Sequence, residues 1–204
     1  MIDLHTHSLF SDGELIPSEL VSRAAAAGYR AIAITDHGDE SNVDFIIPRL
    51  VKACRKLAAA YRMPVLPGIE LTHVPPGDIA ALAREARATG AAVVVVHGET
   101  IVEPVPPGTN AAALRADIDI LAHPGLLTEE DAAAAAARGI FLEITTRGGH
   151  SYTNGHVLKM ARIAGAPLLL NTDCHAPHDL TTRERAVKIA RGAGMSDDEI
   201  AGMW

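Results

Sequence analysis

Residues 2–7 of the chain have the sequence IDLHTH, and residues 169–175 have the sequence LLNTDCH. Each stretch is an apolar, strand-like run that ends in two potential metal ligands spaced two residues apart. In a β-strand, residues i and i+2 point to the same face of the sheet. We therefore expect His5 and His7 to project together, and Asp173 and His175 to do the same. Imidazole and carboxylate groups held in this way suit a divalent metal ion.

Outward from these two stretches, short apolar runs alternate with helical segments along the whole chain. Most runs are continuously apolar, which is typical of parallel strands that are covered on both faces. Seven strand–helix units predict a single α/β domain, residues 1–204, built on a parallel sheet. The predicted strands are residues 2–7, 31–36, 65–70, 92–97, 118–123, 140–145 and 168–173.

Cap-forming residues mark several helix ends. Pro17 suits the first turn of a helix, and Thr128, followed by three acids, suits an N-cap. Residues 196–199 (SDDE) fit a capping box. A left-handed residue is favoured just after a helix, and glycine adopts that conformation readily. The glycines that follow helical runs are Gly28, Gly90 and Gly139.

Each predicted strand carries a polar, metal-competent residue at or near its carboxyl end. In a closed barrel all these ends meet at one rim, whereas in an open sheet the outer strands contribute little to a site. Ligand-type residues on all strands therefore favour a closed barrel. A single histidine at a strand end is more often a structural residue that forms hydrogen bonds. When so many strand ends carry such residues, a separate structural role for each of them is improbable. These residues are His5, His7, Asp36, His37, Glu70, His97, His123, Glu143, Asp173 and His175.

Several motifs occur together in a fixed order along the chain. They are HTH at 5–7, Asp12, TDH at 35–37, GIE at 68–70, His97, AHP at 122–124 and DCH at 173–175. In this combination the chain resembles the polymerase and histidinol phosphatase (PHP) family over nearly its whole length. The resemblance implies a distorted seven-stranded (β/α)7 TIM-like barrel with a site for three divalent metal ions, which would be Zn, Mn or Fe.

The resemblance also implies how the ligands are shared among the three ions. One ion would bind to His5, His7, Glu70 and Asp173, a second to Asp12, His37 and His175, and a third to Glu70, His97 and His123. Glu70 and Asp173 would bridge ions and hold their spacing. Some family members have His where this chain has Asp12, and a carboxylate there shifts the preference from Zn²⁺ toward Mn²⁺ or Fe²⁺.

Clustered divalent ions suit the in-line hydrolysis of phosphoesters, in which an acidified bridging water attacks phosphorus. Arg147, in RGGH at 147–150, could grip phosphate oxygens bidentately, or be a solvated arginine on a turn. His178 is our first candidate for the acid that protonates the leaving group. Weaker expectations concern Glu143 and Glu99, which could orient ligand imidazoles, and Asn154, which could contact substrate.

Composition excludes several classes of protein. Aromatic residues make up 3% of the chain and the formal net charge is −7, which disfavours a long nucleic acid as ligand. Three bound divalent ions would bring that charge to about −1, so the acids need not repel an anionic substrate. No apolar run reaches the roughly 20 residues that span a bilayer, and no secretory signal is visible. Cys54 and Cys174 form no CxxC pair, and we expect a cytoplasmic protein.

We therefore expect a phosphatase that hydrolyses a small phosphomonoester, such as a histidinol phosphate-like compound or a nucleotide. The alternatives are a nucleotide phosphodiesterase or exonuclease, a non-catalytic scaffold subunit, and a hydrolase of C–N bonds. The last class usually needs a bridging lysine in the barrel, and the four lysines of this chain fall on helical segments. Residues 103–108 (EPVPPG) form either an active-site loop or a plain surface loop. The oligomeric state stays open.

Overall fold

The structure, a computed structural model, describes residues 1–203 of the chain. Its strands are β1 (Ile2–Asp3), β2 (Ala31–Ile34), β3 (His37–Gly38), β4 (Val65–Leu71), β5 (Val93–His97), β6 (Ile120–Ala122), β7 (Phe141–Thr145) and β8 (Leu168–Asn171). Its α-helices are α1 (Pro17–Ala26), α2 (Val43–Tyr61), α3 (Ile79–Thr89), α4 (Thr109–Ala113), α5 (Glu129–Arg138), α6 (Asn154–Ala164), α7 (Arg183–Gly192) and α8 (Asp197–Gly202). A 3-10 turn, η1 (His150–Thr153), precedes α6.

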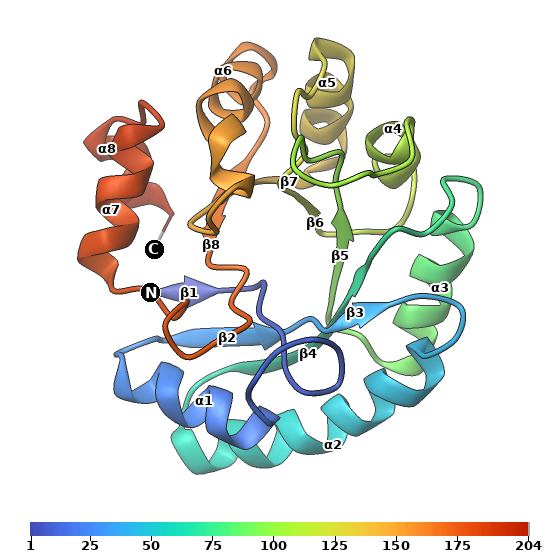
Figure 1. Cartoon of the computed structure of the whole chain (residues 1–204), viewed down its shortest axis with the longest axis vertical. Helices are drawn as coiled ribbons and strands as arrows, with labels where there is room; N and C mark the ends of the chain where they lie inside the picture. The colour runs from blue at the N-terminus through green and yellow to red at the C-terminus, as the bar shows by residue number, and fades with distance from the viewer. Residues whose placement is uncertain (204) are drawn as a thin grey trace.

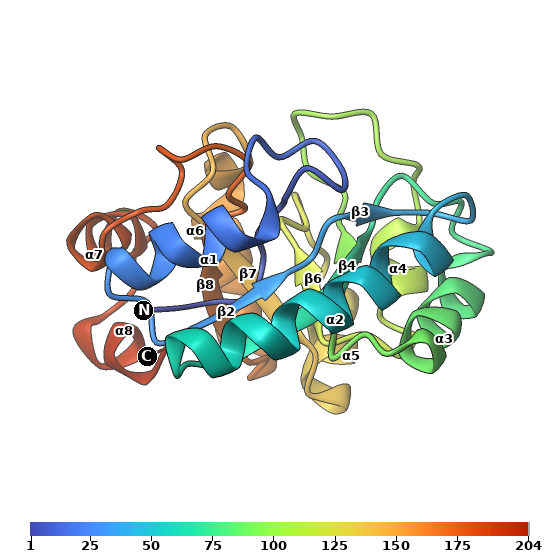
Figure 2. The same cartoon turned by 90° about the horizontal axis from the view of Figure 1, so that it is seen from below.

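The strands form a nearly closed barrel with the helices outside it (Figure 1). Hydrogen-bonded neighbours follow the order β1-β2-β4-β5-β6-β7-β8, every pair is parallel, and β3 pairs with β4 beside this path. The predicted seven-stranded barrel is therefore confirmed. Parallel strands in a ring place all their carboxyl ends on one side, and Figure 2 shows the loops after β1, β5 and β8 rising together on that side.

The first and last strands meet at a seam that closes the ring. Thr6 and Cys174 form an isolated parallel bridge, and the His7 N–H donates to the Cys174 carbonyl oxygen at 2.8 Å. The seam also uses side chains, because Asp3 accepts hydrogen bonds from the hydroxyl and the N–H of Thr172. The barrel is thus tied across a junction where regular strand pairing is short.

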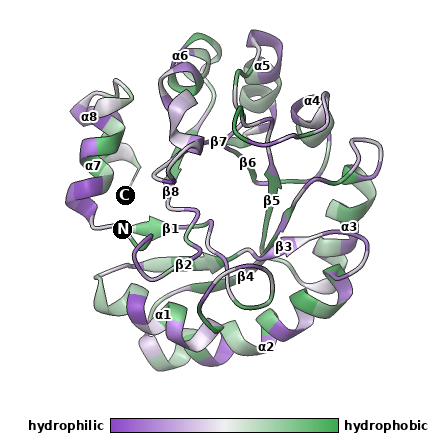
Figure 3. Cartoon of the chain, in the orientation of Figure 1, coloured by the Kyte–Doolittle hydropathy of each residue, from purple (hydrophilic) through white to green (hydrophobic). Residues whose placement is uncertain are grey.

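A small apolar cluster fills the barrel interior below the site. It consists of Ala33, Val93, Val95, Ile120 and Ala122, with Leu4, Leu66 and Leu169 packed against it. Alternate strand residues point the same way, so the inward row Val93, Val95 and His97 runs from this floor into the site. A separate and larger core lies between the strands and the helices, and Figure 3 shows the strands mostly in the hydrophobic colour.

All seven predicted strands occur, but four end earlier than predicted, among them the strand predicted for 31–36, which ends at Ile34. The strand predicted for 168–173 stops at Asn171, and the one predicted for 118–123 spans Ile120–Ala122. The reason is local, because Asp173 has φ +52° and His123 has φ +28°, and neither value fits a strand. The run predicted for 2–7 pairs regularly only at Ile2–Asp3, since His5 and His7 turn into the site. The short strand β3 was not predicted.

The predicted helix signals are confirmed. Pro17 is the first residue of α1, and the Thr128 side chain accepts from the N–H of Asp131 at the start of α5. Ser196 and Glu199 form the capping box of α8. Among residues 1–203, every helix is too short or too polar to cross a lipid bilayer.

Candidate metal centre

The carboxyl rim of the barrel brings all nine predicted ligand residues into one cluster. Glu70 and His97 lie at the ends of β4 and β5, and His37 belongs to β3. The loops after β1, β6 and β8 supply the rest: His5, His7, Asp12, His123, Asp173 and His175. Among these side chains Asp12 is the most exposed, whereas those of His5, His7 and Glu70 are fully buried.

The carboxylate of Glu70 lies at the centre of the cluster. Its Oε2 is 2.7 Å from Nδ1 of His37, and its Oε1 is 3.3 Å from Nε2 of His5 and 3.4 Å from Nδ1 of His97. The two oxygens thus face different histidines. A carboxylate arranged in this way has the geometry to bridge two cations.

The donor atoms fall into overlapping groups whose members all lie within 4.8 Å of one another. One group is His7, Asp12, His37 and His175, a second is His5, His7 and Asp173, and a third is Glu70, His97 and His123. These groups correspond closely to the three ligand sets that the family resemblance implies. The donors are imidazoles and carboxylates, which suit Zn²⁺, Mn²⁺ or Fe²⁺.

Several donor atoms are buried without a hydrogen-bond partner among residues 1–203. They are Nε2 of His5, both ring nitrogens of His7, Oε1 of Glu70 and Nε2 of His97, whose close contacts with one another or with neighbouring carboxylates lack hydrogen-bond geometry. Buried polar atoms without a partner are costly and therefore rare. Burial lowers the pKa of His7 to about 3, so this imidazole is neutral at pH 7, the form that binds a metal. These features fit a site for divalent ions.

Backbone strain is concentrated at the same rim. Asp173 and His123 have positive φ values of 52° and 28°, which side chains other than glycine seldom adopt. Such residues cost free energy and cluster at functional sites. Here the strain follows from the end of the strand, because the chain turns abruptly to direct these two side chains into the cluster.

Glu143 supports two of the histidines from below. Its Oε2 lies 2.8 Å from Nδ1 of His5, and its Oε1 lies 3.3 Å from Nδ1 of His123. An imidazole that donates its Nδ1–H to this carboxylate keeps the lone pair on Nε2 for a metal. Burial raises the pKa of Glu143, but His5 and His123 outweigh burial and hold it at about 2. The carboxylate is therefore ionised, as the orienting role requires.

Other sequence-based expectations need correction. Glu99 does not orient a ligand, because its Oε1 accepts from the N–H groups of Gly108 and Asn110 at the start of α4. Asn154 is buried and bonds to both backbone groups of Thr145, so it holds β7 against α6 and has no free group for substrate. His178 is 84% exposed and lies outside the cavity over the cluster.

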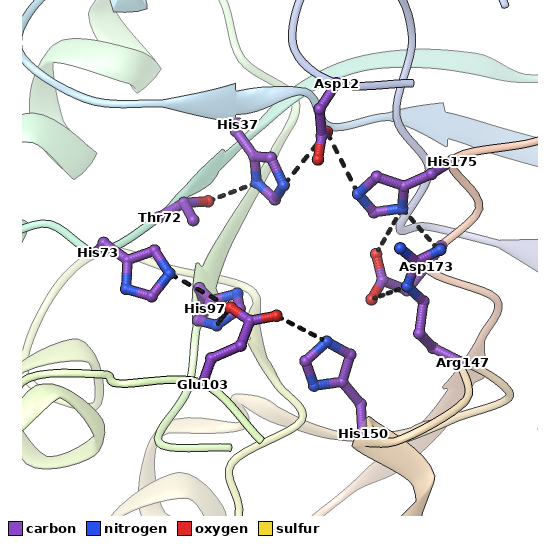
Figure 4. Close-up of a pocket in the computed structure, with 10 residues that line it drawn as sticks. All are labelled: Asp12, His37, Thr72, His73, His97, Glu103, Arg147, His150, Asp173 and His175. Carbon is purple, nitrogen blue, oxygen red and sulfur yellow. Dashed lines mark hydrogen bonds and ion pairs between the residues drawn. The ribbon is translucent and has the colours of Figure 1, made fainter. Parts of the chain in front are cut away.

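A cavity of about 280 Å³ opens over the cluster (Figure 4). Arg147 reaches it beside Asp173 and His175, with its Nε 3.7 Å from Asp173 Oδ2. The expectation that Arg147 lies at the same rim is therefore met. The cavity is lined by Asp12, His37, Thr72, His73, His97, Glu103, Arg147, His150, Asp173 and His175.

Four cavity residues were not predicted as part of the site: Thr72, His73, Glu103 and His150, the last two of which face each other. Glu103 begins the Pro-rich loop, and its Oε2 is 3.2 Å from His97 Nε2, while its Oε1 is 3.3 Å from His150 Nε2. His150 is buried, and its Nδ1 lies 2.8 Å from the Thr100 hydroxyl. The only sequence signal for either residue was its position shortly after a predicted strand. The loop at 103–108 thus contributes Glu103 to the cavity wall.

Comparisons with known proteins agree with this geometry. A model of the PHP domain matches residues 3–100. An uncharacterized protein of Methanocaldococcus jannaschii is 50% identical over 200 residues, which cover 97% of this chain and 92% of that protein. The chain belongs to the PHP family. The resemblance drawn from the sequence motifs is confirmed.

Other proteins similar to this chain have different names. A ribonuclease P protein component 3 of Methanosarcina mazei is 28% identical over 204 residues, covering 92% of this chain and 79% of that protein. A probable phosphatase of Edwardsiella ictaluri is 28% identical over 207 residues, covering 92% and 84%. The histidinol phosphate phosphatase of Lactococcus lactis, solved with zinc, L-histidinol and phosphate, has a TM-score of 0.68 and 18% identity, covering 96% and 94%. This last likeness shows the shared fold.

Proposed function

We propose that this PHP-family protein is a metal-dependent phosphomonoesterase that acts on a small phosphorylated metabolite. One observation carries the proposal. Nine imidazole and carboxylate side chains, with Glu70 at their centre, form overlapping groups, and several of their buried donor atoms form no hydrogen bond within residues 1–203. A scaffold would not gain stability from such atoms, whereas bound divalent ions would satisfy them.

Three divalent ions would be held by the ligand sets already described, with Glu70 shared between two of them. Bound ions would supply Lewis-acid stabilisation of the phosphoryl oxygens and an acidified water. The protein itself keeps the ligands in place, because Glu143 fixes His5 and His123 and the apolar floor excludes water from below.

Arg147 would bind the phosphoryl group at the open side of the cavity. Its side chain is 29% exposed and lies beside Asp173, so a guanidinium N–H can reach both the cluster and a ligand. A planar guanidinium matches two phosphate oxygens at once. The cavity of about 280 Å³ suits a small metabolite better than a polynucleotide.

A second candidate function is a subunit of a nucleoprotein complex, which the likeness to a ribonuclease P component favours. A net charge of −7 counts against an RNA-binding surface. The intact ligand set also counts against a protein that has lost catalysis. The likeness to a probable phosphatase supports the phosphomonoesterase instead.

The direct test measures phosphate release from a panel of phosphomonoesters that includes L-histidinol phosphate and nucleotides. Each assay contains Mn²⁺, Zn²⁺ or a chelator, and the Asp173→Ala variant controls for contaminating phosphatases. Metal-dependent release focused on one compound would support the proposal. If no compound releases phosphate although metal is bound, the same preparation is assayed with phosphodiesters and short oligonucleotides. Hydrolysis of those compounds alone would replace the phosphomonoesterase with a nuclease, and no hydrolysis at all would favour the scaffold.

A further inference from the structure

A second, smaller cavity shares Arg147 with the cavity over the metal-ligand cluster. Its volume is about 70 Å³, and its lining includes Arg147, His178, Asp179, Thr181 and Arg185. We call it the Arg185 cavity. It is built by the loops that follow β7 and β8 and by the first turn of α7. Arg147 lines both cavities, so the two cavities are neighbours that share this residue.

The charges around the Arg185 cavity favour an anion. The guanidinium of Arg185 forms no ion pair with any residue in the range 1–203. Asp179 is the acid in the wall, but its Oδ2 already accepts three hydrogen bonds, from Arg147 at 3.1 Å and from the N–H groups of His175 and Ala176 at 3.0 and 2.9 Å. Its negative charge is therefore engaged, and Arg185, an exposed residue in the first turn of α7, is left without a counter-ion among residues 1–203.

The wall of the cavity also holds a hydroxyl group without a partner. Thr181 is 4% exposed, and its Oγ1 is a buried polar atom that forms no hydrogen bond within the described part of the chain. Buried hydroxyls nearly always find a partner. A hydroxyl can donate to an anionic oxygen, so Thr181 is a second residue of the lining that has an unused polar group.

We infer that the Arg185 cavity binds a second anionic group of the substrate, a phosphate or a carboxylate. The substrate would then be a small phosphomonoester with another anion a few bonds from the phosphate that is hydrolysed. This inference rests on the proposed phosphomonoesterase function, and it narrows the substrate class. Arg147 would contact both anionic groups, and Arg185 only the second one.

The size of the cavity agrees with this inference. A water molecule needs roughly 10–15 Å³ of such space, so about 70 Å³ accommodates the oxygens of one phosphate or carboxylate group. Figure 4 shows Arg147 beside Asp173 and His175 at one side of the larger cavity, where a bound phosphoryl group would already touch it. A second anion linked through a few atoms can then reach Arg185.

The test measures binding without turnover, by calorimetry on the metal-loaded protein. Three ligands of the three-methylene series are compared: propylphosphonate, 4-phosphonobutyrate and propane-1,3-bisphosphonate, with the two- and four-methylene series as spacer variants. A charged hydrogen bond to a guanidinium corresponds to a change of about ten- to a hundredfold in affinity. We expect at least one ligand with two anions to bind about ten times more tightly than its one-anion counterpart. Whether the carboxylate or the bisphosphonate gains more identifies the second anion.

Variants decide whether Arg185 causes that gain. In Arg185→Gln the advantage of the second anion should fall to less than about threefold, because the charge that binds it is gone. The matched control is Lys188→Gln, which removes one positive charge from the same helix outside the cavity and should keep the advantage. An absent advantage in every series, or an equal one in Arg185→Gln, would overturn the inference.

The outcomes separate this inference from the proposed function. Hydrolysis of simple phosphomonoesters with no effect of Arg185 would refute only the second-anion site. An Arg185-dependent preference in binding, without hydrolysis of any phosphomonoester, would refute only the phosphomonoesterase and leave a binding site for two anions.

Discussion

Each predicted histidine ligand would bind a metal ion through a ring nitrogen, so a single substitution tests it. His7 is fully buried and forms no hydrogen bond through either ring nitrogen within residues 1–203. His7→Ala removes this unsatisfied group, and we expect the barrel to stay folded while metal-dependent turnover falls at least about a hundredfold. Circular dichroism, metal content and phosphate release check this. Full activity in a folded variant would exclude His7 from the metal site.

Glu143 acts through two histidines, and its removal should affect metal affinity more than folding. Glu143→Gln removes the negative charge that accepts the Nδ1–H groups of His5 and His123. Removal of a carboxylate that orients ligand histidines typically lowers metal affinity or activity 10- to 100-fold. The matched control is Glu99→Gln, whose carboxylate accepts two N–H groups at the start of α4. It should cost about 1 kcal/mol of stability and leave metal affinity alone. Metal titrations and urea unfolding of both variants distinguish the two roles, and equal metal affinity in Glu143→Gln and wild type would refute the orienting role.

Substitution of Arg147 should weaken the binding of substrate without changing the binding of metal. Arg147→Ala removes the guanidinium at the cavity rim, so KM for phosphorylated substrates should rise by about tenfold or more. Metal content should not change, because no predicted metal ligand is removed. Steady-state kinetics and metal analysis check both. Unaltered kinetics would mean that Arg147 is a solvated arginine on a turn and does not bind substrate.

At the scale of the elements, the turn after β6 must bring His123 into the cluster within very little space. Gly125 has φ +66°, and a Cβ there would lie 1.8 Å from the carbonyl oxygen of Glu99. Gly139, at the end of α5, has nearly the same φ of +67° but no atom within 4 Å of that position. Substitutions at the two glycines therefore distinguish two costs in folding free energy. One is the strain of a left-handed backbone at a residue with a side chain, and the other is the steric clash of a Cβ with a neighbouring backbone atom.

Alanine at these two glycines should have different effects. Gly139→Ala should cost only about 1 kcal/mol, the penalty for a left-handed alanine. Gly125→Ala adds a steric clash and should cost about 2 to 4 kcal/mol in total. It should also weaken metal binding, because the turn that carries His123 must shift. Urea unfolding and metal titration measure both effects, and equal losses in the two variants would contradict the close approach.

At the scale of the whole molecule, the barrel closes through a buried acid. Asp3 accepts from Thr172 across the seam between β1 and β8 and from the N–H of His5. Burial raises the pKa of Asp3 to about 6 from 3.8, although the hydrogen bonds from Thr172 act in the opposite direction. Between pH 4 and 6 the folded state therefore binds more protons than the unfolded state, and stability falls as the pH rises.

Asp3→Asn should remove this pH dependence. The amide oxygen can accept the two N–H groups, and the Thr172 hydroxyl can turn to accept from the amide nitrogen. In chelator, we expect the variant to be more stable than wild type at pH 7 by up to about 3 kcal/mol. The difference should vanish near pH 4. Urea unfolding of both proteins from pH 4 to 7 tests this, and a difference that does not vary with pH would contradict it.

The sequence by itself determined the barrel and the nine residues of the candidate metal centre. Strand periodicity is local, so alternation places His97 on the inward row with Val93 and Val95 without knowledge of the rest of the fold. Parallel strands in a ring then bring such residues to a common rim. The strand ends were less accurate, because the positive φ of Asp173 and His123 depends on the site that these residues build.

Only the tertiary structure decided which other side chains reach this rim. Glu103 and His150 are 47 residues apart in sequence yet face each other at 3.3 Å, and Asp3 meets Thr172 at the seam. Glu99, two residues after His97, instead caps α4. Contacts of this kind depend on loop paths and on how the helices pack, and a local pattern of residues does not specify either of them. The Arg185 cavity arises in the same way, from two loops and a helix that meet only in the folded chain.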